Sequence, residues 1–283
     1  MEDFREITFL KPIKFYNMKP MIKKTALFLT IILLTACNSV LLTGRKQLLL
    51  VSDQEVLSLS NTSYQTFMQS AVKSTKTTES ATVLRVGQKI TSAVEAYLSQ
   101  QSLSAQINGY TWSFNLVKDA SVNAFCMPGG KIVVYEGILP VTLNDAGLAV
   151  VLGHEIAHAV AKHANERMSQ EMLTNYGATT LSALMSKKSA AAQNIAQTVF
   201  GLGAEVGVTL PYSRKQEYEA DRLGLIFMAM AGYDPSQAIS FWERMSAQAQ
   251  TSMPEFLSTH PSDTKRIANL KVVLAEAQTY YKK

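Results

Sequence analysis

Residues 148–163 read LAVVLGHEIAHAVAKH, and residues 154–158 within them form the pattern H-E-x-x-H. The apolar residues before the pattern predict a buried helix. Because residues four apart share a helix face, His154 and His158 can bind one ion, and zinc accepts imidazole nitrogen. Glu155 then lies beside the ion, where it can take a proton from a water. The alternative is a surface helix whose histidines are fortuitous.

A catalytic zinc ion usually has three protein ligands and a water. His163 follows His158 by five residues and would point elsewhere on a continuous helix, so we interpret it as structural or exposed. Glu217 and Asp221 are four apart in Glu217-Tyr218-Glu219-Ala220-Asp221 and share a face. We expect Glu217 to be the third ligand and Asp221 to hold the free N–H of His154. The alternative is a solvated charged face.

The composition fits one sizeable folded domain. The chain has 283 residues, of which 47% are hydrophobic and 17% charged, and this balance excludes a disordered chain. The formal charge of +5 is concentrated in residues 1–36, which hold six basic and three acidic side chains. We therefore expect no nucleic-acid partner. Two cysteines cannot build a disulfide framework, and Cys126 is expected to be a small buried residue.

The N-terminal segment has the pattern of a secretory signal. Lys23 and Lys24 precede an apolar run over 25–34, and LTAC at residues 34–37 resembles a bacterial lipobox. We expect a signal peptide over 1–36 with an over-extended start, translation beginning at Met18 or Met21, and lipidation of Cys37. An ordinary signal peptide is the alternative. Residues 37–50 are then a lipidated tether and 51–283 the domain, held on a membrane surface in the bacterial cell envelope and facing the periplasm.

The periodicity predicts an α+β fold that is mostly helical with one small β-sheet. Asn144 is expected to cap a helix that runs past His163, and Asp234-Pro235 to start another. The expected helices cover 53–75, 79–101, 144–163, 217–230, 234 onward and 262–280, with broken helices over 168–209. The expected strands cover 111–117, 123–125 and 131–135.

Three sets of motifs together resemble one family. They are residues 154–168, the two stretches 210–214 and 217–222, and Val122 to Phe125 with Pro128-Gly129-Gly130 and Thr259-His260-Pro261. They are similar to the CAAX-prenyl-protease-type zinc metallopeptidases, which include the HtpX, BepA and Oma proteases, and most similar to lipid-anchored bacterial members. The resemblance runs from Thr43 to Arg266 and departs at Cys126 and Gly147. It implies a gluzincin-like domain, one Zn2+ ion per chain and Glu217 as third ligand.

The same resemblance implies further site residues. His260 would donate to the oxyanion that forms on the scissile carbonyl, and Arg266 would support it. Asn123, Ala124 and Phe125 would pair with an extended polypeptide substrate. A loop histidine and an ordinary edge strand are the respective alternatives. Residues 190–208 are interpreted either as a lid or as close helix packing.

Two functions follow from these observations. The first is a zinc endopeptidase that cleaves unfolded or misassembled cell-envelope proteins, with Glu155 as general base. The second is a lipid-anchored chaperone or assembly factor whose zinc site is latent or structural. Structural zinc sites usually close with four protein ligands, often cysteines, and the metal motifs contain none.

Overall fold

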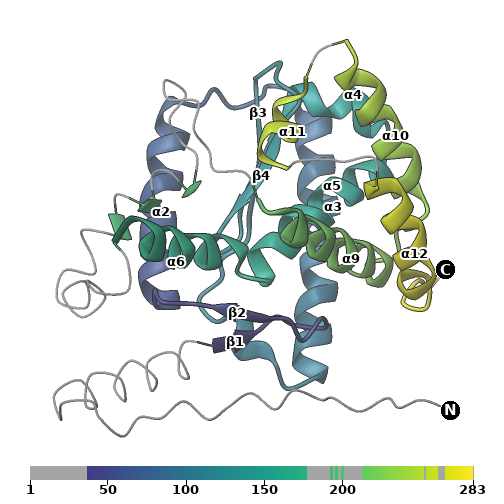
Figure 1. Ribbon diagram of the computed structural model, residues 1–283. Coiled ribbons are helices and arrows are strands. Elements are labelled where there is room, and N and C mark those ends of the chain that lie inside the picture. The colour runs from purple at the N-terminus through teal and green to yellow at the C-terminus, as the bar shows by residue number, and fades with distance from the viewer. Residues whose placement is uncertain are drawn as a thin grey trace, which may run out of the picture.

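A computed structural model describes residues 37–176, 192–193, 195–196, 199–200, 212–251, 253–260 and 265–282. The expected signal peptide over 1–36 and most of 190–208 lie outside the described residues. The fold is α+β and mostly helical, as predicted (Figure 1). Its helices are α2 (Asp53–Ser70), α3 (Thr77–Gln100), α4 (Leu139–Thr142), α5 (Asp145–Val160), α6 (His163–Tyr176), α9 (Arg214–Met230), α10 (Gln237–Ala249), α11 (Glu255–Thr259) and α12 (Arg266–Gln278).

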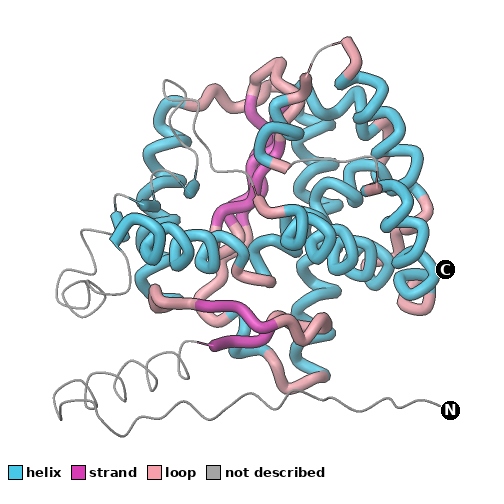
Figure 2. The backbone as a smooth tube through the Cα atoms, viewed as in Figure 1, coloured by secondary structure: helices cyan, strands magenta, loops and turns pink. Residues whose placement is uncertain are grey.

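A three-stranded sheet stands at the middle of the molecule (Figure 2). Its strands are β3 (Ser113–Val117), β4 (Ala124–Met127) and β5 (Lys131–Tyr135), in the order β3-β5-β4. β5 runs parallel to β3 and antiparallel to β4, so β4 is an edge strand. The tight turn between β4 and β5 needs positive φ at Gly129 and Gly130, a conformation that glycine adopts without strain.

A second small sheet occupies the segment that the sequence suggested was a tether. β1 (Cys37–Ser39) and β2 (Lys46–Leu48) form an antiparallel hairpin. Val40 and Gln47 are buried, and Leu50 N donates to Ser169 Oγ on α6 at 2.8 Å. The hairpin is therefore packed onto the domain instead of hanging free. Among the described residues, no helix is long and apolar enough to cross a membrane.

Helix α5 carries the H-E-x-x-H pattern through the centre of the core. It packs against α9, α3 and α10 (Figure 1), and from Gly147 to Val160 every residue is buried. The predicted cap is confirmed, because Asn144 Oδ1 accepts from Gly147 N at 2.9 Å. A helix buried all round is a rigid platform for the side chains at its centre.

The helix ends earlier than the sequence predicted. α5 stops at Val160, Lys162 adopts a φ of 57°, and α6 starts afresh at His163. This break reorients His163, which a continuous helix would have turned away from His158. α10 likewise begins at Gln237 and not at Asp234-Pro235, because Asp234 Oδ1 accepts from Ser236 N and forms a turn before the helix.

Two glycines let α5 and α9 approach closely. A Cβ atom on Gly224 would lie 2.8 Å from His154 N, and one on Gly153 would lie 2.8 Å from Gly224 O. Both obstacles are backbone atoms, which cannot move aside as a flexible side chain can. The close approach places the imidazole of His154 opposite the acidic residues of α9.

We expect Gly224→Ala to destabilise the fold by about 1–3 kcal/mol, because the added methyl pushes the two helices apart. The sign is informative, since Ala in an unobstructed helix interior stabilises by roughly 0.5–1 kcal/mol relative to Gly. Thermal unfolding of the purified variant measures the effect. An unchanged or raised melting temperature would show that the helices do not meet at Gly224.

Candidate metal centre

Four side chains from two helices and one loop meet at the middle of α5. Among the described residues, His154, His158, Glu217 and His260 form a buried group whose possible ligand atoms lie within 4.8 Å of one another. His154 and His158 come from successive turns of α5, and Glu217 comes from the first turn of α9. His260 follows directly after α11. The structure thus brings together the three ligands expected from the sequence.

The spacing of these atoms matches the edges of a tetrahedron. Bonds of about 2.0–2.1 Å to zinc imply ligand atoms roughly 3.3 Å apart. The Nε2 atoms of His154 and His158 are 3.1 Å apart, and His158 Nε2 is 3.3 Å from Glu217 Oε1. His260 Nδ1 lies 3.2 Å from His154 Nε2 and 3.1 Å from Glu217 Oε1. The donor set therefore fits a small divalent ion such as zinc.

The outer nitrogen of His154 has an anionic partner. His154 Nδ1 lies 3.0 Å from Asp221 Oδ1, as the spacing in the sequence suggested. In the neutral imidazole, Nδ1–H donates a hydrogen bond to this carboxylate. The lone pair of Nε2 is then directed at the ligand group. Burial lowers the pKa of His154, but hydrogen bonds to Asp221 and Glu217 outweigh it and raise the pKa to about 9. These surroundings favour a positive charge between the ligand atoms.

Arg266 pairs with both acidic side chains of the centre, Asp221 and Glu217. Its Nε and Nη2 donate to the two oxygens of Asp221 at 2.8 and 2.7 Å, and its Nη1 lies 3.0 Å from Glu217 Oε2. The guanidinium is buried and lies 3.5 Å from the centre of the Trp242 ring. Burial raises the pKa of Glu217, but His260 and Arg266 outweigh it and hold that pKa well below its usual range. Arg266 thus contacts Glu217 and Asp221, whereas the sequence suggested that it supports His260.

Glu155 is placed as the H-E-x-x-H pattern predicts, beside the ligand group. Its side chain is buried, and its Oε2 accepts from Cys126 N of β4 at 3.1 Å. Its Oε1 lies 3.4 Å from His260 Nε2. Burial raises the pKa of Glu155. A raised pKa suits a carboxylate that must both accept and return a proton near neutral pH.

His260 lies closer to the ligand group than the resemblance suggested. Its Nδ1 faces His154 and Glu217, and its Nε2 faces Glu155. The ring stacks on Phe256 with centroids 4.5 Å apart. The main chain of α11 is tied to the remainder of the fold, since Tyr212 N donates to Thr259 O at 3.0 Å and Phe256 N to Val122 O. In this arrangement His260 Nδ1 is a fourth possible ligand atom of the same group.

The outer nitrogen of His158 meets a residue whose role the sequence left open. His163 is buried, and its Nδ1 lies 2.9 Å from His158 Nδ1. His163 Nε2 lies 3.0 Å from Glu219 Oε2, and Arg45 Nε donates to the same oxygen at 2.6 Å. Burial raises the pKa of Glu219, but hydrogen bonds from His163, Thr43 and Arg45 lower it to about 2. His163 is therefore structural and not exposed.

Sequence reasoning also missed Tyr212. The centroids of the Tyr212 and His158 rings lie 3.9 Å apart. The guanidinium of Arg167 lies 4.2 Å from the centroid of the Tyr212 ring. The ring covers one face of a ligand imidazole. The position of Tyr212, five residues before Glu217 and outside the helix, gave no periodic signal that could have placed it here.

Strand β4 passes directly beside Glu155. Tyr135 N of β5 donates to Asn123 O. Because the backbone N–H and C=O groups of successive residues point to opposite sides of a strand, those of Ala124 and Cys126 face away from β5. Ala124 N donates to the side-chain Oδ1 of its neighbour Asn123 at 2.9 Å. Phe125 is turned the other way, and its ring packs on Phe67 and Tyr135. The edge that does not pair with β5 is therefore formed by the backbone of Ala124 and Cys126, and both residues are buried.

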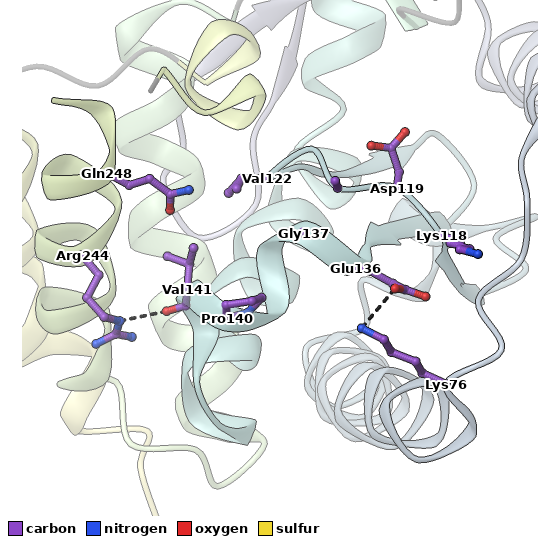
Figure 3. Close-up of a pocket in the computed structure, with 11 residues that line it drawn as sticks. Lys76, Lys118, Asp119, Val122, Glu136, Gly137, Pro140, Val141, Arg244 and Gln248 are labelled. Carbon is purple, nitrogen blue, oxygen red and sulfur yellow. Dashed lines mark hydrogen bonds and ion pairs between the residues drawn. The ribbon is translucent and has the colours of Figure 1, made fainter. Parts of the chain in front are cut away.

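An open groove of about 760 Å³ adjoins the start of this edge. Figure 3 shows its two sides, with Arg244 and Gln248 of α10 on one and Asp119 and Lys118 on the other. Val122, which immediately precedes the edge residues, lines it as well.

The described part of 190–208 packs against α6 and α2. Ile195, Val199 and Phe200 are buried in a cluster with Met168 of α6 and Val56 of α2. The remainder of the segment, for which a lid or close helix packing was predicted, lies outside the described residues. Cys37, the expected lipidation site, is the first residue of β1.

Several metallopeptidases are similar in sequence. The mitochondrial metalloendopeptidase OMA1 of Schizosaccharomyces pombe is 40% identical over 170 residues, which cover 59% of this chain and 48% of that protein. The OMA1 metalloendopeptidase of Homo sapiens is 33% identical over 244 residues, 83% of this chain and 45% of that protein. The β-barrel assembly-enhancing protease of Escherichia coli is 32% identical over 164 residues, 56% and 33% of the two chains. The chain thus spans half or less of the length of these relatives.

The family model of peptidase family M48 matches residues 88–273. This range includes the two helices and the loop that supply His154, His158, Glu217 and His260. The match also covers Glu155 and strand β4, and it agrees with the resemblance inferred from the motifs. The chain belongs to peptidase family M48.

Proposed function

We propose that this protein is a zinc-dependent endopeptidase. The observation that carries the proposal is the position of Glu155, whose carboxylate borders a buried group of His154, His158 and Glu217. That arrangement combines a site for a Lewis acid with an adjacent general base, the two groups that metal-assisted hydrolysis of a peptide bond uses. Membership of peptidase family M48 supports the same reaction.

The metal would be held by His154 and His158 through Nε2 and by Glu217. When bound there, zinc supplies polarisation of the scissile carbonyl and a lowered pKa for a water. Glu155 accepts a proton from the attacking water and then returns it to the leaving nitrogen. His260 Nε2 faces the same space as Glu155, so it can donate to the oxyanion that develops on the substrate.

The substrate would be an extended polypeptide. The backbone of Ala124 and Cys126 offers a strand edge, and the pairing of main-chain groups tolerates many side chains. Cys126 N now donates to Glu155. Because one residue of this edge contacts the general base, a peptide paired with β4 would place its scissile bond next to Glu155.

We also propose the location and the class of substrate. The signal-like pattern that ends at Cys37 supports a lipid anchor on a membrane surface of the bacterial cell envelope. Unfolded or misassembled envelope proteins are then the accessible polypeptides. The relatives differ here, since OMA1 is named mitochondrial and the Escherichia coli protein is named for β-barrel assembly.

One observation favours the alternative of a chaperone with a latent or structural zinc site. With His260 counted, the group offers four protein donors, and closed four-ligand sites are typical of structural zinc. As a fourth ligand, His260 would have to leave before water and substrate could bind there. A protein that suppresses aggregation of a client without cutting it, with or without Glu155, would support this alternative.

Degradation of casein by the purified chain tests the proposal most simply. We expect cleavage that stops when a chelator removes the metal and returns when zinc is added back, because the reaction needs both the ion and Glu155. Gel electrophoresis of the products over time measures it. Cleavage that persists in excess chelator would contradict a metallopeptidase, and zinc binding without any cleavage would favour the alternative.

A further inference from the structure

The N-terminal hairpin reaches the metal centre through a continuous chain of polar contacts. Arg45 directly precedes β2 and is largely buried, with 13% of its side chain exposed. Its Nε donates to Glu219 Oε2 on α9, and Glu219 in turn contacts His163 on α6. His163 contacts His158, which offers its other nitrogen to the ligand group. In Figure 1 the hairpin lies below α6 and α9.

The donor and the acceptor of each hydrogen bond in this series of contacts follow from the charge of Glu219. An ionised Glu219 only accepts, so His163 must donate from Nε2 and its Nδ1 is left as an acceptor. His158 then donates from Nδ1, and its Nε2 keeps the lone pair that a metal needs. One carboxylate thus sets the tautomers of two imidazoles.

Arg45 holds this carboxylate in place from the opposite side. Its Nη1 and Nη2 donate to the two oxygens of Glu166 on α6 at 2.6 and 2.7 Å, while its Nε takes Glu219. Thr43 Oγ1 donates to the other oxygen of Glu219. The planar guanidinium therefore fixes α6 and α9 relative to each other, a geometry that lysine cannot reproduce.

We propose that Arg45 is a positioning residue for the metal centre, and that it acts through Glu219 and His163 on the ligand His158. The proposal rests on the proposed zinc site. In this proposal the hairpin over 37–48 positions a ligand of the metal site and is not only a tether. Removing the hydrogen-bond partner of a ligand histidine typically weakens metal binding by about 10–100-fold.

The test is the zinc affinity of the full chain, measured by competition with a chromophoric chelator. We expect His163→Phe, which keeps a ring but cannot accept from His158, to weaken zinc binding by roughly 10–100-fold. Arg45→Gln, one step further out, should weaken it by about tenfold. Arg222→Gln is the matched control, because Arg222 makes a similar forked pair, but with Glu276 of α12 and not with Glu219. Its zinc affinity should equal that of the unmodified chain.

A double variant separates positioning from general loosening of the fold. If Arg45 acts through His163, Arg45→Gln should have no further effect on zinc affinity in a chain that already carries His163→Phe. Additive losses, or an unchanged affinity in Arg45→Gln, would overturn the proposal. Should Arg45→Gln fail to fold by circular dichroism, Glu219→Gln tests the same contact. An unmodified chain that bound no zinc would overturn the metal centre and this proposal together.

Discussion

Glu155→Gln is expected to bind zinc like the unmodified chain and to lose peptidase activity by about 10²–10⁴-fold. The amide keeps the size of the side chain and an oxygen that can accept from Cys126 N, so the surroundings of the ligands are preserved. It cannot take a proton from water, which removes the general base. The measurement pairs the initial rate of casein cleavage with the zinc content of the same sample.

Glu276→Gln provides the matched control for this substitution. This substitution also removes a carboxylate, but Glu276 lies on α12, pairs with Arg222 of α9 at a partly exposed position and is not in the group of possible ligands. Its activity should stay close to that of the unmodified chain. Undiminished cleavage by Glu155→Gln would remove this residue from the mechanism, and joint loss of zinc and activity would assign it to the metal site instead.

Glu217→Ala is expected to lose zinc as well as activity. The proposed ligand set would keep only His154 and His158, and His260 would lose the contact of its Nδ1 with Glu217 Oε1. The divalent ion then lacks its only anionic ligand and has too few well-placed donors. The fold should persist, because Arg266 keeps its paired hydrogen bonds to Asp221. Metal analysis after dialysis should fall from about one ion per chain to a trace.

A smaller change at the same position distinguishes a ligand from a structural acid. Glu217→Gln retains an oxygen of the right reach but no charge, so we expect zinc binding between those of the unmodified chain and Glu217→Ala. Circular dichroism should confirm that all three proteins are folded. Full zinc occupancy in a folded Glu217→Ala protein would contradict the assignment of the third ligand.

The sequence predicted the parts of the site that lie at helical spacing. His154 with His158, and Glu217 with Asp221, are each four residues apart, and the structure places each pair on one face of α5 or α9. The tertiary contact between the two helices could not be derived from either pattern. It depends on Gly153 and Gly224, whose missing side chains carry no periodic signal.

The sequence failed where the chain changes direction. The helix was expected to run past His163, and only the break at Lys162 turns this imidazole towards His158. Arg45 lies more than a hundred residues before its partner Glu166, in a segment whose composition suggested a tether. His260 was expected near the substrate, and its closeness to His154 follows from the packing of α11.

A crystal structure of the full chain grown with zinc, with diffraction data collected at the zinc absorption edge, tests the central claim most directly. We predict one anomalous peak bonded to the Nε2 atoms of His154 and His158 and to a carboxylate oxygen of Glu217, at about 2.0–2.2 Å. A peak elsewhere would contradict the account. So would imidazoles that face apart, or Glu217 directed to solvent.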